Sequence, residues 1–393
     1  MQSISATKQN TSVPKVFAGL SGGVDSAVAA ALLKKQGNDV TGVFIRIVVP
    51  EYPCTAGQDK LDAMRAAAHL RIPFLEVDLS KEYQKKVFEI SILEFKKGKT
   101  PNPDILCNRE IKFGLFYDWC RARGADFVAM GHYARRAKST DFGYGDFLAK
   151  KSPEVASPPL GKPPPSVILL SGIDPDKDQS YFLALVPETT LRRTLFPVGY
   201  LTKRKVRAFA KKFGLPNAER PDSQGLCFLG PISIGDMLSR ELLPSPGKVL
   251  NEDGEVIGMH KGAALYTLGQ RHGFGAPSSV PLYVIAKNME KNTITVSPNK
   301  FPKKATKTEI ILSEMNWIGP VYDGQCFARY RYKQTLIPAE LHKNKVTLHE
   351  PHYVPLGQIL VLYKGDALSQ SSSRRRLGMR CLGGGVIDSV KII

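Results

Sequence analysis

The sequence predicts an α/β fold in which a parallel sheet carries helices on both faces and is followed by β-rich segments that end in a barrel. Two observations support this prediction. Apolar runs typical of buried strands alternate with helical patterns up to about residue 132. From about residue 245, glycine and proline recur and short alternating runs replace the helical pattern.

The N-terminal region accounts for the parallel sheet. Strands are predicted from residue 15 and over 39–48, 72–79 and 126–132, and helices over 27–33, 58–70, 83–96, 177–193 and 202–214. Ligands of such sheets bind outside the carboxyl ends of the strands. We therefore expect Ser21–Ser26, Ile45 and Gly131-His132 to surround one crevice.

The C-terminal region accounts for the β-rich part. Short strands are predicted over 248–250, 256–258, 282–285 and 293–296, and again over 346–348 and 358–363.

Residues 151–166 are rich in Pro, Ser and Lys, which predicts a flexible surface excursion within the first domain.

Composition limits the class of protein. A chain of 393 residues is long enough for two or three domains. No apolar run approaches the roughly 20 residues that span a bilayer, and Met1 to Pro14 has no signal-peptide pattern, so we expect a cytoplasmic protein without a membrane segment. Six irregularly spaced cysteines without a CxxC argue against a disulfide framework. The net charge of +19 suggests a polyanionic partner, although a solvated basic surface also explains it.

The run from Ala18 to Ser26, AGLSGGVDS, lies between the first strand and the first helix. Its glycine pair lets the backbone approach a bulky anion, and the N–H groups of the first helical turn point at that anion. Ser21 and Ser26 add hydroxyl donors, and Asp25 suits a divalent cation beside phosphate oxygens. A plain tight turn would explain Gly-Gly but not the whole pattern. The run resembles the pyrophosphate loop of the ATP pyrophosphatases, and with an ATP site in the chain, RNA becomes the leading candidate for the polyanion.

A second feature is the segment from Thr100 to Asn108, TPNPDILCN. Asn102 suits the N-cap of a helix and Pro103 its first position. Asp104 and Cys107 then share one face, with the thiolate favoured near an exposed helix start and the carboxylate able to accept a proton. The alternative is a small buried cysteine in a capped helix.

The third feature is Cys227, which follows a glycine turn in the run Asp222 to Phe228. We expect it to be accessible, although it also suits a small apolar filler before Phe228. Two accessible cysteines beside an ATP site suggest sulfur chemistry, in which one cysteine carries a persulfide and the pair cycles through a disulfide.

Together these motifs resemble the tRNA-uridine 2-sulfurtransferases, also called tRNA-specific 2-thiouridylases. The resemblance runs from about Val16 to Val386 and includes matches in order at 19–26, 98–108, 111–113, 131–133, 177–183, 196–199, 225–228, 246–248, 266–271, 331–335 and 357–358. It implies a Rossmann-like ATP-pyrophosphatase (PP-loop) domain over 1–232 with an insertion near 144–167, a small central β-rich domain over 233–304 and a β-barrel over 305–393.

The resemblance also implies an activity, the ATP-dependent 2-thiolation of the wobble uridine of tRNA. Uridine O2 would be adenylated and sulfur would come from a persulfide on Cys227, loaded by an upstream sulfur-carrier protein or cysteine desulfurase. Cys107 would close a disulfide with Cys227, and Asp104 would act as acid or base. The protein would be a monomer.

The implied binding residues fall into two sets. ATP would contact Gly19, Leu20, Ser21, Gly22, Gly23, Val24, Asp25, Ser26, Ile45 and Gly131, with Mg²⁺ at Asp25. The anticodon stem-loop of tRNA would contact Asn102, Pro103, Asp104, His132, Lys177, Asp178, Gln179, Arg331, Tyr332 and Gln358.

The chain departs from the family pattern in places. Ile45-Arg46-Ile47 stands where members often have Met-Lys-Asn, so the adenine contact at Ile45 is expected through the backbone. Cys54 is left as structural or accessory, Cys120 is expected to pack, and Cys326 and Cys381 carry no catalytic signal. Two alternatives remain: another PP-loop ATP pyrophosphatase acting on RNA or an amide-forming substrate, and a noncatalytic RNA-binding protein.

Overall fold

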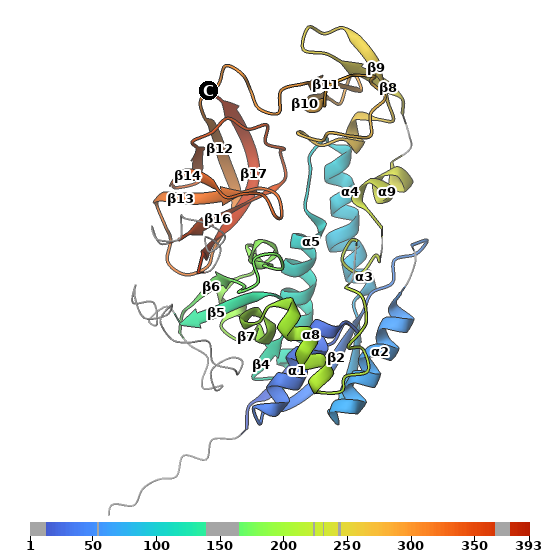
Figure 1. Cartoon of the computed structure of the whole chain (residues 1–393), viewed down its shortest axis with the longest axis vertical. Helices are drawn as coiled ribbons and strands as arrows, with labels where there is room; N and C mark the ends of the chain where they lie inside the picture. The colour runs from blue at the N-terminus through green and yellow to red at the C-terminus, as the bar shows by residue number, and fades with distance from the viewer. Residues whose placement is uncertain are drawn as a thin grey trace, which may run out of the picture.

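The computed structural model describes residues 13–52, 55–138, 165–222, 225–230, 232–242, 245–365 and 378–393. The described part contains three sheets, which Figure 1 shows in different regions of the molecule. Within these residues no helix has the length and apolar character needed to cross a membrane. Cys54 lies outside the described ranges. Residues 139–164, which include most of the proline-rich segment 151–166, lie outside them as well.

The first sheet is the predicted parallel sheet. Its strand order is β3-β2-β1-β4-β7, and every neighbouring pair is parallel. The bounds are β1 (Lys15–Gly19), β2 (Asp39–Arg46), β3 (Phe74–Asp78), β4 (Phe127–Ala129) and β7 (Thr194–Leu195).

Helices cover both faces of this sheet because its strands are apolar on both sides. Val16 and Phe44 pack with Ala30 of α1 (Val24–Lys35) and Ala63 of α2 (Ala56–Leu70). On the other face, Phe17 packs in the main core with two continuous helical runs. The first run consists of α3 (Ser80–Tyr83), η1 (Gln84–Phe88) and α4 (Glu89–Lys96). The second consists of α5 (Pro103–Leu106), η2 (Cys107–Leu115) and α6 (Phe116–Ala122).

The predicted helix over 177–193 is wrong, although α8 (Lys203–Lys212) confirms the next one. The segment forms only a 3₁₀ turn, η4 (Ser180–Leu183), and one helical turn, α7 (Glu188–Leu191). Pro187 interrupts the pattern because proline has no N–H to donate. The Asp178 carboxylate also accepts hydrogen bonds from the backbone of Gly172 and Ser180, which holds the chain in a turn.

The predicted β-rich part forms the other two sheets. A four-stranded sheet in the order β10-β11-β8-β9 uses β8 (Gly247–Leu250), β9 (Val256–His260), β10 (Tyr283–Asn288) and β11 (Thr293–Ser297), after the helix α9 (Ile234–Glu241). The C-terminal sheet closes into the expected barrel because β12 pairs with β17. Its strands are β12 (Thr308–Trp317), β13 (Gly324–Arg329), β14 (Ile337–His342), β15 (Lys345–Leu348), β16 (Ile359–Lys364) and β17 (Arg380–Ile392).

The barrel sheet is extended by two strands from the N-terminal half of the chain, which the sequence did not predict. A hairpin-like pair, β5 (Ala134–Lys138) and β6 (Val167–Ser171), joins the edge of β17, where Cys381 lies opposite Leu169. Figure 1 shows these strands between the parallel sheet and the barrel. The two parts of the chain are therefore joined by backbone pairing.

A buried ion pair reinforces this junction. Arg329 of β13 lies 3.2 Å from the Asp178 carboxylate, and both side chains are only 4% exposed. The Tyr363 hydroxyl contacts Arg329 Nε at 3.1 Å and Ser180 Oγ at 3.3 Å. Because both charges are buried, removing one leaves the other without its opposite charge in the interior.

We predict that Arg329→Met destabilises the protein by about 3–5 kcal/mol, because it strands the Asp178 carboxylate. Urea unfolding followed by fluorescence would show the midpoint falling by at least about 1 M. Tyr363→Phe, which removes one hydroxyl and keeps both charges, is the matched control, with an effect of about 1 kcal/mol. An Arg329→Met midpoint equal to that of the unaltered protein would contradict the role of this pair.

Candidate active site

The loop between β1 and α1 is shaped by its two serines. Ser26 Oγ donates to the carbonyl of Gly23 at 3.0 Å and accepts from the N–H of Ser21 at 3.1 Å. The N-cap of α1, Gly23, has no side-chain cap, and Asp25 lies in the first turn. The first N–H groups of α1 are therefore available to an anion.

Two glycines of the site are required by close packing. A Cβ on Gly131 would lie 2.8 Å from the backbone nitrogen of Ser26, so β4 ends directly against the first turn of α1. Gly22 has φ +78°, and a Cβ there would lie 2.5 Å from the carbonyl oxygen of Asp59. The loop thus packs against α2 with no room for a side chain.

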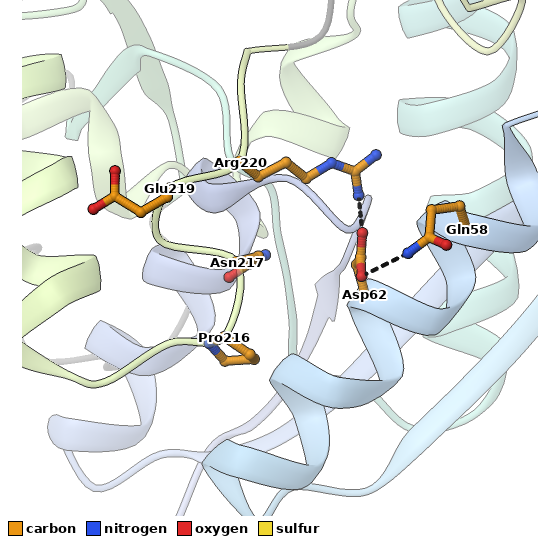
Figure 2. Close-up of a pocket in the computed structure, with 6 residues that line it drawn as sticks. All are labelled: Gln58, Asp62, Pro216, Asn217, Glu219 and Arg220. Carbon is orange, nitrogen blue, oxygen red and sulfur yellow. Dashed lines mark hydrogen bonds and ion pairs between the residues drawn. The ribbon is translucent and has the colours of Figure 1, made fainter.

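The outer side of the loop is supported by the segment after α8. Asn217 Nδ2 donates to the carbonyl of Gly22 at 2.7 Å, and Arg220 binds the carboxylates of Asp59 and Asp62. Figure 2 shows Arg220 and Gln58 both directed at Asp62, beside a cavity of about 300 Å³. Sequence reasoning missed these supporting residues because they come from distant segments.

A second cavity, of about 290 Å³, opens on the loop at the carboxyl ends of the strands. It brings together three of the predicted tRNA contacts, Lys177, Gln179 and Tyr332, with the loop between β1 and α1. Its lining is Ser21, Gly23, Val24, Asp25, Tyr133, Asp176, Lys177, Gln179, Pro221, Asp222, Tyr332 and Lys333. The predicted adenine-side residue Ile45 is not part of this lining; it is buried in β2 within the main core.

A charge network crosses this cavity. Lys203 of α8 lies 2.7 Å from Asp25 Oδ1 and 2.7 Å from Asp222 Oδ1, and the Tyr133 hydroxyl donates to Asp25 at 2.7 Å. Lys177 also pairs with Asp222 at 2.7 Å. Burial raises the pKa of Asp222, but the hydrogen bonds from Lys177 and Lys203 outweigh it and hold the pKa at about 2. Lys203 and Tyr133 were not predicted as site residues.

The segment around Asn102 folds as predicted at its start. Asn102 Oδ1 accepts from the N–H of Ile105 at 3.1 Å and Pro103 opens α5. The expectation of an exposed helix start is wrong, however, because Cys107 is fully buried. The helix continues through the π-helical η2 into α6 and packs Cys107 into the main core.

The two predicted cysteines lie side by side. Cys107 Sγ donates to Cys227 Sγ at 3.4 Å, although 120 residues separate them in sequence. The turn that carries Cys227 is anchored at both backbone polar groups: its N–H donates to Asp104 Oδ1 at 3.1 Å, and its carbonyl accepts from the Tyr83 hydroxyl at 2.9 Å. Phe228 follows in the left-handed region with φ 66°, which a tight turn here requires.

The environment favours the thiolate on Cys227 and not on Cys107, which reverses the expectation from the sequence. The hydrogen bond from Cys107 lowers the pKa of Cys227 to about 7, against the effect of burial. Burial raises the pKa of Cys107 well above its usual value. Burial also raises the pKa of Asp104, which makes its carboxylate a better proton acceptor.

The remaining predicted tRNA contacts are less accessible. His132 is buried, with Nε2 3.0 Å from Asn108 Oδ1, and burial lowers its pKa. Gln358 is buried and accepts from Asn102 Nδ2 at 3.3 Å, while Arg331 donates to the carbonyl of Leu268. Asp178 is held in its ion pair with Arg329, so a direct contact with RNA would require that pair to open.

The other described cysteines are buried. Burial raises the pKa of Cys120, Cys326 and Cys381 to about 12 in each case. The expectation that Cys120 packs is confirmed, since it lies in the main core.

Comparison with known proteins identifies the architecture first. A tRNA methyl transferase HUP domain model matches residues 14–231, a tRNA methyl transferase PRC-barrel domain model matches 235–298, and an aminomethyltransferase beta-barrel domain model matches 307–369. The chain is thus a HUP-domain protein with two C-terminal β domains.

Curated relatives identify the family. The tRNA-specific 2-thiouridylase MnmA of Geobacillus thermodenitrificans is 37% identical over 96% of this chain and 95% of its own length. The enzymes of that name from Enterococcus faecalis and Bacillus licheniformis are 37% and 38% identical, with coverage of 96% of this chain in each case and of 96% and 95% of their own lengths. The chain belongs to the tRNA-specific 2-thiouridylase family.

Two solved structures align with part of this chain. A 4-thiouridine synthetase in complex with RNA and ATP aligns with a TM-score of 0.32 and 16% identity over 58% of this chain and 50% of that chain. The NMN synthetase of Francisella tularensis aligns with a TM-score of 0.31 and 15% identity over 54% and 67%.

The contact between the sulfur atoms predicts that mild oxidation, for example with diamide, links Cys107 to Cys227. Mass spectrometry of a non-reduced digest would show this cross-linked peptide pair as the main product. Cys120, Cys326 and Cys381 serve as internal controls and stay reduced, because each is buried with a raised pKa and, unlike Cys107, has no sulfur contact with Cys227. Recovery of Cys107 and Cys227 as separate alkylated peptides after oxidation would contradict this arrangement.

Proposed function

We propose that the chain catalyses ATP-dependent 2-thiolation of the wobble uridine (U34) of tRNA, giving 2-thiouridine, AMP and pyrophosphate. The observation that carries the proposal is the 3.4 Å contact between Cys107 and Cys227 in a chain that also holds the Ser21–Ser26 loop. Membership of the tRNA-specific 2-thiouridylase family supports the same reaction. A noncatalytic RNA-binding protein has no use for the paired sulfurs.

In this proposal the loop from Gly19 to Ser26 holds the phosphates of ATP. The uncapped N-terminus of α1 supplies N–H donors, and Gly131 lets β4 end directly against that turn. Lys177 lines the same cavity, Lys203 pairs with Asp25 of its lining, and both supply positive charge. Ile45 and Gly131 would border the adenosine through their backbone.

Asp25 is the residue proposed to hold Mg²⁺. One carboxylate suits this ion, which usually binds one or two carboxylates together with phosphate oxygens and waters. No group of three or more His, Cys, Asp or Glu suited to a metal occurs among the described residues, so phosphate oxygens would complete the coordination. Lys203 and the Tyr133 hydroxyl already satisfy Asp25, so Lys203 would have to move from Asp25 toward the phosphates. The ion would neutralise charge on the leaving pyrophosphate.

The sulfur step uses the contact between the two cysteines. Cys227 would carry the persulfide, and the Cys107 sulfur would attack Cys227 Sγ after losing its proton to Asp104. A disulfide forms, the Cys227 bond to the terminal sulfur breaks, and that sulfur leaves either already attached to uridine C2 or as hydrosulfide that then displaces AMP. A thiol reductant would reset the pair.

The tRNA would approach from the side of α5. Asn102, Pro103 and Asp104 lie at the helix start beside the sulfurs and are proposed to contact the uridine. Lys177, Gln179 and Tyr332 line the cavity, and Arg331 precedes Tyr332 in the chain. The net charge of +19 supports a salt-sensitive contribution from phosphate contacts. We further propose a cytoplasmic monomer that receives its sulfur from a persulfide-carrying protein.

The proposal predicts that Cys107→Ser and Cys227→Ser each abolish thiolation, with a loss of at least about 10³-fold, because each removes a reacting atom. Retarded migration of thiolated tRNA in a mercury-containing gel measures the product. Binding of tRNA, measured by filter retention, should change less than about threefold, because a serine hydroxyl replaces a thiol at little cost in shape.

Cys120→Ser is the matched control, since Cys120 lies in α6 of the same helical run but takes no part in the proposed sulfur step. It should retain thiolation. Full thiolation by either of the first two variants would refute the two-cysteine mechanism. Loss of tRNA binding by both would instead indicate a structural role.

A further inference from the structure

Lys112 lies beside the two sulfurs although no motif argument assigned it a role. It follows Cys107 by five residues in η2, and in a π-helix residues five apart lie on the same face. Its Nζ lies 5.7 Å from the ring centroid of Phe228, the residue that follows Cys227. The lysine therefore reaches the turn that carries Cys227.

The groups that face the Cys227 sulfur come from three elements. Cys107 and Asp104 come from the α5–η2 run, Lys112 comes from η2, and Tyr83 comes from α3. Among them Lys112 is the only cation, because Tyr83, Cys107 and Asp104 are neutral or acidic. Buried His132, which borders Lys112, has its pKa lowered by burial and then by Lys112, so it is neutral near pH 7.

Lys112 keeps its charge in this setting. Burial alone would lower its pKa, as it does for a lysine without a partner. The sulfurs of Cys227 and Cys107, and then the Asp104 carboxylate, outweigh burial and raise the pKa of Lys112. A protonated amine beside a thiol favours the thiolate.

We propose that the Lys112 ammonium, placed beside the Cys227 turn, favours the Cys227 sulfur as a thiolate for sulfur loading. The inference rests on the proposed function. In the loading step the Cys227 thiolate attacks the terminal sulfur of a donor persulfide. A bond forms between Cys227 Sγ and that sulfur, the donor's own S–S bond breaks, and the electron pair leaves on the donor's thiolate. The step needs no oxidant. The negative charge leaves with the donor's thiolate, and the new persulfide becomes an anion beside Lys112 only after its proton is released to solvent.

The test measures the thiolate directly. Brief alkylation with iodoacetamide across pH 6 to 10, with the Cys227 peptide quantified by mass spectrometry, gives the pH profile of this one sulfur. In Lys112→Met the pKa of Cys227 should rise toward the ordinary value for a thiol. Because less thiolate is then present, alkylation at pH 7 should fall at least about 10-fold, while the rates at pH 10 converge with those of the unaltered protein.

Two variants separate charge from structure. Lys112→Arg keeps the cation and should restore alkylation at pH 7 to within about threefold. Lys86→Met is the matched control, because Lys86 lies in η1 and contacts Glu110 of η2 at 3.6 Å without facing either sulfur. Its profile should match that of the unaltered protein.

Two results would overturn the proposal. One is an unchanged profile in Lys112→Met. The other is a loss that is equal at every pH, which would mean that Lys112 only shapes access to the sulfur. Alkylation requires neither ATP nor tRNA, so these outcomes are independent of whether the chain thiolates uridine.

Discussion

The site depends on one contact, the docking of the Cys227 turn onto the start of the α5–η2 helical run. Asp104 and Tyr83 fix the backbone of Cys227 from both sides, and the two sulfur atoms then meet at 3.4 Å. A residue in the left-handed region, Phe228, makes the turn tight enough for this approach. Without this contact the chain would have a nucleotide loop and two unrelated thiols.

The same C-terminal segment of the HUP domain also reaches the nucleotide loop. Asn217 holds the carbonyl of Gly22, and Asp222 is joined through Lys203 to Asp25. Asn217 and Asp222 therefore connect to the β1–α1 loop, while Cys227, a few residues further along the chain, contacts Cys107.

Features with a local signal were predicted from the sequence. The parallel strands, the glycine loop and the Asn102 cap follow from apolar runs and turn residues, and they are confirmed. Features that arise only from tertiary contact were missed. Lys203 lies 178 residues from Asp25, and the pairing of β6 with β17 joins distant parts of the chain. The ionisation of the cysteines was predicted for the wrong residue, because burial of Cys107 outweighs its place near a helix start.

The central claim is that Cys227 delivers sulfur and Cys107 completes the transfer by forming a disulfide. A single-turnover reaction tests it most directly: protein loaded with radiolabelled persulfide sulfur on Cys227 is mixed with tRNA and ATP, and both products are followed in time. We expect label to enter the tRNA only with ATP, together with an equal amount of the Cys107–Cys227 disulfide. Transfer of label to tRNA without ATP, or without the disulfide, would contradict the account.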